Sequence, residues 1–308
     1  MSGINSQMTA GQWASLWVLS VLWGGTFFFV EIGLTGLPPL SLVALRVLIA
    51  SLALWGFVLA TGRTVPRAAG VWGAFLVMAL LNNALPWSLI FWGQQQITAS
   101  LASILNATTP VFTVLIAGAV LSDERLTPLR LIGAVVGLCG AVLVIGPAAI
   151  FGLGADVLPQ LAVVGAAISY SVSGVYGRRF KRMGVDPAMG AAGQVTMAAL
   201  VMIPVALTFE RPLDGPMPGW EVWAAVAGMA LLSTAVAYVL VFRLLASAGA
   251  TNFLLVTLLI PVSAVTLGVV FLGETLLWSH GAGLLVIGLG LSLIDGRLWL
   301  GRRHAGRA

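Results

Sequence analysis

Ten long apolar stretches constrain the fold of this chain more than any other feature of its sequence. A helix needs about 20 apolar residues to cross a bilayer, and in hydrocarbon only helices and closed barrels satisfy every backbone hydrogen-bonding group. These stretches lack the alternation of polar and apolar residues that marks barrel strands. The sequence therefore predicts an all-α integral membrane protein with ten transmembrane helices, at residues 11–32, 39–60, 69–92, 97–121, 127–147, 157–180, 187–209, 219–246, 250–272 and 278–299.

The composition excludes a soluble protein and argues against nucleic acid as a partner. The 308 residues are 59% hydrophobic and only 8% charged, whereas a soluble domain carries about 25% charged residues. The net charge of +5 comes from basic residues in short connections and in the tail, where they act as topology signals. We therefore expect a lipid bilayer as the surroundings, a small molecule as the substrate, and a monomer.

The basic residues also predict the orientation of the chain. If residues 1–10 form a cytoplasmic N-terminus, thirteen of the fifteen basic residues lie on the cytoplasmic side and only Arg211 lies opposite. This distribution follows the positive-inside rule and places the basic tail, residues 297–308, in the cytoplasm as well. The thirteen are Arg63, Arg67, Arg125, Arg130, Arg178, Arg179, Lys181, Arg182, Arg243, Arg297, Arg302, Arg303 and Arg307.

The two halves of the chain resemble one another. Corresponding pairs, at offsets of 148 to 151 residues, are Pro39 with Pro187, Arg46 with Gln194, Trp87 with Tyr238, Phe91 with Phe242, Ala99 with Ala250, Pro110 with Pro261, Glu124 with Glu274, Gly133 with Gly283 and Gly140 with Gly290. A five-helix unit is therefore predicted twice, over residues 11–147 and 157–296. Because five is odd, the second copy enters the membrane from the opposite face, which is the inverted repeat of many secondary transporters.

Several short motifs carry a family resemblance over nearly the whole chain. The first half contains Trp23-Gly24-Gly25-Thr26-Phe27, Gly36-Leu37-Pro38-Pro39, Leu45-Arg46 and Leu121-Ser122-Asp123-Glu124-Arg125-Leu126, and the second contains Phe271-Leu272-Gly273-Glu274-Thr275-Leu276. In order, spacing and duplication they resemble the EamA family of the drug/metabolite transporter superfamily, and within it most resemble the aromatic amino-acid exporters. The resemblance implies a multi-pass carrier of the bacterial inner membrane that exports amino acids or related metabolites. The first copy departs from the usual Gly-Glu by carrying Ser-Asp-Glu, but the carboxylate is retained.

Three prolines inside the apolar stretches predict where a substrate binds. Pro-interrupted segments at matching places of two halves mark the binding site in many transporters. Each proline leaves the carbonyl four residues earlier without its helical partner, and these carbonyls belong to Asn82, Asn106 and Thr257. A kink repaired by a neighbouring side chain or by water fits the same pattern. We predict helix breaks with a gating role at Pro86, Pro110 and Pro261.

Polar and aromatic side chains at membrane depth are the candidates for lining the cavity. Asn82 and Asn83 are costly in lipid without partners, and their amides suit the carboxylate and ammonium of an amino acid. Trp87 and Tyr238 suit the apolar part of a ligand, although plain helix packing would explain them as well. The residues predicted to bind substrate are Trp17, Trp23, Asn82, Asn83, Trp87, Asn106, Tyr170, Ser173, Tyr176, Tyr238, Asn252 and Thr257.

Three charged residues are assigned structural roles. Arg46 lies inside the second stretch, where its charge must snorkel, pair with an acid such as Glu31, or face water. Its repeat mate is Gln194, so the repeat itself does not demand a charge. Glu124 and Glu274 are repeat mates at the ends of the fourth and ninth stretches, and we expect both to be structural.

The acids and histidines lie in connections or at the ends of stretches, so we predict facilitated export without a titratable proton carrier. We expect no catalytic residue, no metal ion and no cofactor, because the nucleophile, base or ligand cluster of an intramembrane enzyme and an ATP-binding motif are missing. A passive channel or lipid scramblase remains an alternative because it needs no chemistry in its walls. A sugar-phosphate or drug carrier of the same superfamily is a weaker one, since phosphate requires central Lys or Arg and only Arg46 offers it.

Overall fold

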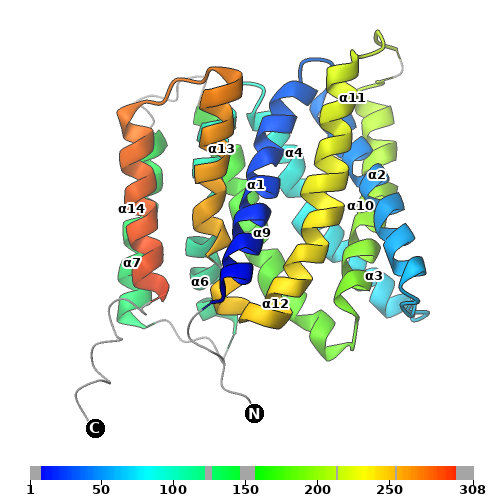
Figure 1. Ribbon diagram of the computed structural model, residues 1–308, viewed down its shortest axis with the longest axis horizontal. Coiled ribbons are helices and arrows are strands. Elements are labelled where there is room, and N and C mark those ends of the chain that lie inside the picture. Colours follow the sequence, from blue (N-terminus) through cyan, green and yellow to red (C-terminus); the bar gives the residue numbers. More distant parts are fainter. Residues whose placement is uncertain (1–7, 122–126, 146–156, 213, 254, 296–308) are drawn as a thin grey trace.

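The protein is an all-helical bundle in the part of the chain that the computed structural model describes, which comprises residues 8–121, 127–145, 157–212, 214–253 and 255–295. The helices run roughly along one common direction (Figure 1). Within these ranges eight helical stretches are long and apolar enough to cross a membrane, and Val256–Leu272 and Trp278–Ile294 are shorter apolar helices. The predicted all-α class is confirmed.

The helices follow the predicted stretches, and several stretches consist of more than one helix. In the first half they are α1 (Ala10–Gly33), α2 (Pro39–Ala60), α3 (Ala69–Ala79), the π-helix η1 (Leu80–Ala84), α4 (Leu85–Gly93), α5 (Ala99–Asn106), α6 (Thr109–Val120) and α7 (Pro128–Ile145). In the second half they are α9 (Val157–Arg182), α10 (Pro187–Phe209), α11 (Trp220–Ala227), the π-helix η2 (Gly228–Val236), α12 (Ala237–Phe253), α13 (Val256–Leu272) and α14 (Trp278–Asp295).

One predicted boundary between stretches is wrong. The eighth stretch was expected to end at residue 246 and the ninth to begin at 250, but α12 continues to Phe253 and α13 begins at Val256. Residues 246–250 contain three alanines and no proline, so this segment favours continuation of the helix. As a result α13 has only 17 residues.

The prolines occupy two different settings. Pro86 lies in the first turn of α4 and Pro110 in the first turn of α6. At Pro110 the proline costs little, because the first N–H groups of a helix that follows a turn have no helical partner. α4 instead continues directly from η1, where the Leu85 N–H donates to the Leu80 carbonyl, so Pro86 interrupts a continuous helical stretch. Pro261 lies inside α13, so the helix continues through the position where a break was expected.

Two carboxylates stabilise the starts of helices in the other half of the chain. Glu210 accepts hydrogen bonds from the backbone N–H groups of Leu40, at 2.9 Å, and Ser41, at 2.7 Å, in the first turn of α2. Glu274 likewise accepts from two backbone N–H groups at the start of α5, at 2.8 and 3.0 Å, and from the Ser100 hydroxyl. The first N–H groups of a helix lack partners and form its positive end, which favours an anion.

Helices α2 and α10 pack against each other in opposite directions. Glu210 follows the end of α10 and contacts the start of α2. At the other end of the pair, Arg63 follows the end of α2 and forms an ion pair with Asp186, the N-cap of α10. The two helices are therefore joined by polar contacts at both ends.

Helices α7 and α14 also pack closely and in opposite directions, through glycines. A Cβ atom on Gly133 would lie 2.6 Å from the carbonyl oxygen of Gly290, and one on Gly140 would lie 2.9 Å from that of Gly283. Gly133 therefore faces Gly290, which is the repeat mate of Gly140, and Gly140 faces Gly283, which is the repeat mate of Gly133. Contacts this short leave no room for a side chain, so the backbones themselves form the interface.

Candidate functional site

Two π-helices bring polar side chains to matching places in the two halves. η1 carries Asn82 and Asn83, near the middle of the stretch from α3 to α4, and η2 carries Ser233 and Thr234. These pairs are related by the same offset of 151 residues that joins Trp87 to Tyr238. π-helical turns occur frequently at functional sites. The repeat relation between Asn82 and Ser233 would have indicated η2 from the sequence.

Arg46 lies at the centre of the bundle rather than at its surface. Its side chain is only 4% exposed, and its Nε donates a hydrogen bond to the Thr234 hydroxyl oxygen at 3.0 Å. The guanidinium carbon lies 3.6 Å from the centre of the Trp87 ring and 5.9 Å from that of Phe91. The Thr234 hydroxyl in turn donates to the Met229 carbonyl at 3.0 Å. Trp87 of the first half and Thr234 of the second half thus hold Arg46 in place.

An amide and hydroxyl network lies beside Arg46. Asn82 Nδ2 donates to Gln194 Oε1 at 3.2 Å and to the Tyr238 hydroxyl oxygen at 3.4 Å. The Ser173 hydroxyl donates to Asn82 Oδ1 at 3.0 Å. The Ser173 hydroxyl also lies within hydrogen-bond distance, 2.7 Å, of the Tyr170 carbonyl oxygen. This set, which we call the central cluster, comprises Arg46, Asn82, Asn83, Trp87, Tyr170, Ser173, Gln194, Ser233, Thr234 and Tyr238.

Several polar atoms in and near the central cluster are buried without a hydrogen-bond partner among the described residues. They are Arg46 Nη1, both amide atoms of Asn83, the Ser233 hydroxyl and, at the end of α5, Asn106 Oδ1. Buried polar groups are paired in most proteins, and each unpaired one is costly. The arrangement therefore offers both donors and acceptors to a polar ligand, and the neutral amides and hydroxyls suit reversible binding rather than covalent chemistry.

Side-chain hydroxyls occupy the carbonyls that the helix interruptions leave open. The Asn106 carbonyl, which Pro110 leaves without a helical partner, accepts a hydrogen bond from the Thr109 hydroxyl at 2.7 Å. In η1 the Leu81 carbonyl accepts from the Ser169 hydroxyl at 2.7 Å. Repair by neighbouring side chains therefore operates at the interruptions near Pro86 and Pro110.

Other predicted residues lie away from the central cluster. Trp17 is 45% exposed, and Trp23 packs edge-on against Phe253 with ring centres 6.0 Å apart. Tyr176 accepts a hydrogen bond from Arg179 at 3.2 Å, near the end of α9. Thr257 is half-buried in α13. Glu124 and the side chain of Asn252 fall outside the described residues.

The acid expected to pair with Arg46 has other partners. Glu31 accepts a hydrogen bond from Gln94 Nε2 at 3.4 Å, and the same nitrogen donates to the Phe27 carbonyl at 2.9 Å. The predicted Arg46–Glu31 contact is replaced by Thr234 and Trp87 because α2 turns its Arg46 face toward η2 and α4. Gln194 and Thr234 were not predicted as site residues, although Gln194 was recognised as the repeat mate of Arg46.

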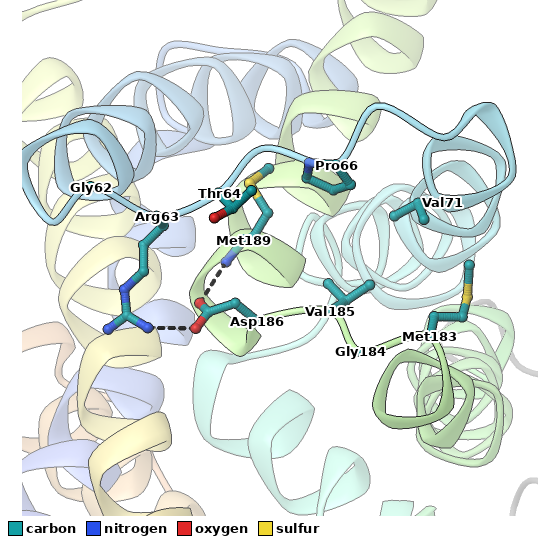
Figure 2. A pocket seen from close by; sticks show the side chains of 10 residues that line it. All are labelled: Gly62, Arg63, Thr64, Pro66, Val71, Met183, Gly184, Val185, Asp186 and Met189. Atoms are coloured by element: carbon teal, nitrogen blue, oxygen red, sulfur yellow. Dashed lines mark hydrogen bonds and ion pairs between the residues drawn. The ribbon is translucent and has the colours of Figure 1, made fainter.

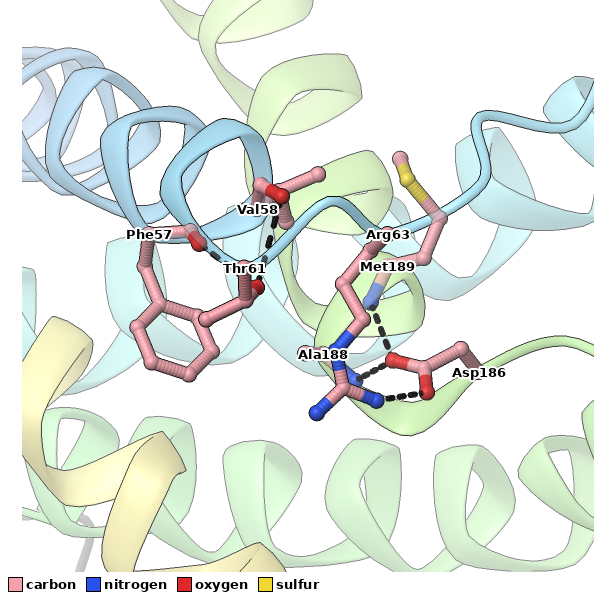
Figure 3. A network of polar contacts seen from close by, with 7 residues as sticks. All are labelled: Phe57, Val58, Thr61, Arg63, Asp186, Ala188 and Met189. Atoms are coloured by element: carbon pink, nitrogen blue, oxygen red, sulfur yellow. Dashed lines mark hydrogen bonds and ion pairs between the residues drawn. The ribbon is translucent and has the colours of Figure 1, made fainter.

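A second polar site lies at the end of the bundle where α2 and α9 end. A cavity of about 380 Å³ is lined by the connection after α2, including Arg63 and Thr64, and by the segment from Met183 to Met189 (Figure 2). Asp186 accepts hydrogen bonds from the backbone N–H groups of Ala188, at 2.9 Å, and Met189, at 3.3 Å, and pairs with Arg63 (Figure 3). In the described part of the chain, His, Cys, Asp and Glu side chains do not gather in groups of three or more that could hold a metal ion.

Comparison with known proteins yields relatives that are named as transporters. The uncharacterized inner membrane transporter YedA of Escherichia coli (strain K12) is 27% identical over 265 residues, which cover 85% of this chain and 83% of the relative. The uncharacterized transporter YoaV of Bacillus subtilis (strain 168) is 24% identical over 281 residues, covering 89% and 92%. Protein PecM of Dickeya dadantii is 24% identical over 278 residues, covering 89% of each chain.

The fold and the family are also recognised over almost the full length. A solved crystal structure that is 23% identical has a TM-score of 0.68 and covers 95% of this chain and 100% of its own, which shows a shared fold. The model of the EamA-like transporter family matches residues 12–146 and again residues 158–295. The chain therefore belongs to the EamA-like transporter family and is a membrane transporter.

Proposed function

We propose that the protein exports small metabolites of no net charge, namely amino acids with aromatic or other apolar side chains, across the bacterial inner membrane. The observation that carries this proposal is the central cluster, in which amides, hydroxyls and aromatic rings from both halves meet at the depth of the two π-helices. Such a lining suits a zwitterion that also has an apolar part, because a ligand site combines apolar walls with a few oriented polar groups.

The mechanism proposed is alternating access by two inverted five-helix repeats. It is supported by the two separate family matches and by the opposite directions in which α2 packs on α10 and α7 on α14. In this mechanism the protein works as a monomer, with both termini in the cytoplasm and the substrate bound between the repeats. Export is facilitated, because the central cluster contains no carboxylate or histidine to carry a proton.

Counterflow in proteoliposomes tests the proposal. Vesicles loaded with one unlabelled amino acid should accumulate its radiolabelled form transiently, with saturation and stereoselectivity, in a panel that includes Trp, Phe, Thr and Met. Asn82→Ala should raise the half-saturation concentration at least about 10-fold, because a hydrogen bond to a charged group contributes about 1.5–3 kcal/mol. Trp87→Ala should raise it by a similar factor, because it removes an aromatic wall of the site, and burying an apolar side chain contributes about 1.5–3 kcal/mol. Gln96→Ala removes an exposed amide and should leave it unchanged.

The alternatives give different results in the same assay. A channel or lipid scramblase would show no counterflow and no stereoselectivity. Unchanged half-saturation in the Asn82 and Trp87 variants would remove the central cluster from the substrate path even if transport is confirmed.

A further inference from the structure

A permanent positive charge is buried at the centre of this bundle. Arg46 is the eighth residue of α2, about 10 Å along the helix from its start at the rise of an α-helix, and its side chain is 4% exposed. A guanidinium does not lose its proton in proteins. Burying such a charge is costly unless an opposite charge and hydrogen bonds compensate it.

No described residue supplies the opposite charge. No carboxylate of the described residues lies within ion-pair distance of Arg46, and Glu31 bonds Gln94 instead. The groups that do contact Arg46 are neutral: the Thr234 hydroxyl and the face of Trp87. These dipoles orient the guanidinium but leave its net charge uncompensated.

The guanidinium of Arg46 is also held so that one of its nitrogens, Nη1, makes no hydrogen bond to the described residues. Thr234 engages Nε and Trp87 covers one face, while Nη1 is buried without a hydrogen-bond partner. The Tyr238 hydroxyl oxygen accepts a hydrogen bond from Asn82, and both amide atoms of Asn83 are buried without a hydrogen-bond partner among the described residues. An oriented donor beside unpaired polar atoms is typical of a pre-organised ligand site.

We propose that Arg46 binds the carboxylate of the substrate through Nη1, so the central cluster selects organic carboxylates over uncharged analogues. This deepens, and rests on, the function proposed above, and it replaces the purely structural role first assigned to Arg46. The carboxylate supplies the missing negative charge, and an N⁺–H···O⁻ bond is about twice as strong as a neutral one. The repeat mate of Arg46 is the uncharged Gln194, so only the Arg46 side of the central cluster carries a positive charge. The substrate therefore binds in one orientation, with its carboxylate toward Arg46.

The test is competition in the counterflow assay with radiolabelled phenylalanine. The competitors are phenylalanine, phenylalaninamide, 3-phenylpropionate, 3-phenylpropionamide and phenyl phosphate. In the wild type each carboxylate should compete about 10- to 100-fold more strongly than its amide, the factor that a charge-assisted hydrogen bond of about 1.5–3 kcal/mol provides. Equal competition by acid and amide would overturn the proposal, and so would stronger competition by phenyl phosphate.

Variants of Arg46 separate binding from structure. Arg46→Gln installs the residue of the repeat mate and removes the charge, so the preference for acids over amides should disappear while the affinity for the amides is retained. Arg46→Lys keeps the charge and should keep part of the preference. If Arg46→Gln weakens acids and amides equally, or keeps the preference, the residue does not bind the carboxylate.

A second readout does not depend on transport or on the variants. The apparent melting temperature of the detergent-solubilised wild type should rise with 3-phenylpropionate and not with 3-phenylpropionamide at equal concentration, because a ligand stabilises the state that binds it. No rise with the acid would overturn the proposal. Absence of counterflow with every amino acid would contradict the proposed function, whereas counterflow without a preference for carboxylates would contradict only the role of Arg46.

Discussion

At the scale of single residues, carboxylates hold the ends of helices from across the molecule. Glu210 and Glu274 each contact the first turn of a helix that lies 169 to 175 positions away in the chain. Gly268 leaves the space that this requires, because a Cβ atom on it would lie 2.3 Å from a carboxylate oxygen of Glu274. The two carboxylates therefore cross-link the halves through the positive ends of α2 and α5.

Replacing either carboxylate by an amide should destabilise the protein. Glu210→Gln and Glu274→Gln keep one acceptor oxygen but turn an NH2 group toward a backbone N–H. We expect the free energy of unfolding to fall by about 1–2 kcal/mol in each case, measured as a lower apparent Tm in detergent. Asp214→Asn, on an exposed side chain in the connection between α10 and α11, is the control and should change it by less than about 0.5 kcal/mol. Three equal Tm values would show that the caps do not contribute.

At the scale of elements, the interruptions of the helices and the glycine contacts have separate roles. η1 and η2 depart from α-helical geometry where polar side chains gather, and Ser169 and Thr234 occupy backbone carbonyls there. α7 and α14 instead remain regular and meet through backbone atoms. The first arrangement shapes the site, and the second fixes two helices at the edge of the bundle (Figure 1).

Gly288 and Gly290 of α14 allow the effect of close helix packing on stability to be separated from the effect of glycine on helix propensity. A Cβ atom on Gly290 would lie 2.5 Å from the backbone nitrogen of Gly137, whereas one on Gly288 would meet nothing within 4 Å. Gly290→Ala should lower the free energy of unfolding by about 1–3 kcal/mol, because the helices must separate. Gly288→Ala should leave it unchanged or raise it by up to about 1 kcal/mol through helix propensity. Urea or thermal unfolding in detergent measures both, and a loss of stability confined to Gly288→Ala would contradict the packing.

At the scale of the whole molecule, the two ends of the bundle differ in charge. Arg63 and the basic segment from Arg178 to Arg182 lie at the end where α2 and α9 finish, while Arg211 follows α10 at the opposite end. α10 separates the two ends by 23 residues, or about 34 Å at the rise of an α-helix. This asymmetry is the basis for proposing that the Arg63 end faces the cytoplasm.

Labelling with a membrane-impermeant maleimide tests this orientation. Cys139 is exposed, so Cys139→Ser is the background for single cysteines at two exposed positions, Thr64 and Met217. Thr64→Cys should react only in inside-out vesicles and Met217→Cys only in intact cells or right-side-out vesicles. The background variant alone should not react. The reverse pattern would place the termini outside, and reaction of both positions from one side would contradict the antiparallel arrangement of the repeats.

The site could be predicted from the sequence only in part. Asn82, Trp87 and Tyr238 were predicted from proline positions and repeat matches, and the structure brings them together with Tyr170 and Ser173. Their contact with substrate remains a prediction. Thr234 was missed because a threonine in an apolar helix carries little signal by itself. Trp17 and Tyr176 were included because sequence spacing does not show which face of a helix meets the cluster.

The sequence by itself determined the helical class, the membrane surroundings and the duplication of the chain. These follow from quantities that are local, namely the transfer free energy of about 20 successive residues and the similarity of residues at a constant offset. Only the tertiary structure decided that Arg46 meets Thr234, 188 positions away, instead of Glu31, and that the π-helices interrupt the third and eighth stretches. Such contacts depend on how the two halves rotate and pack against each other, and packing is a property of the assembled bundle.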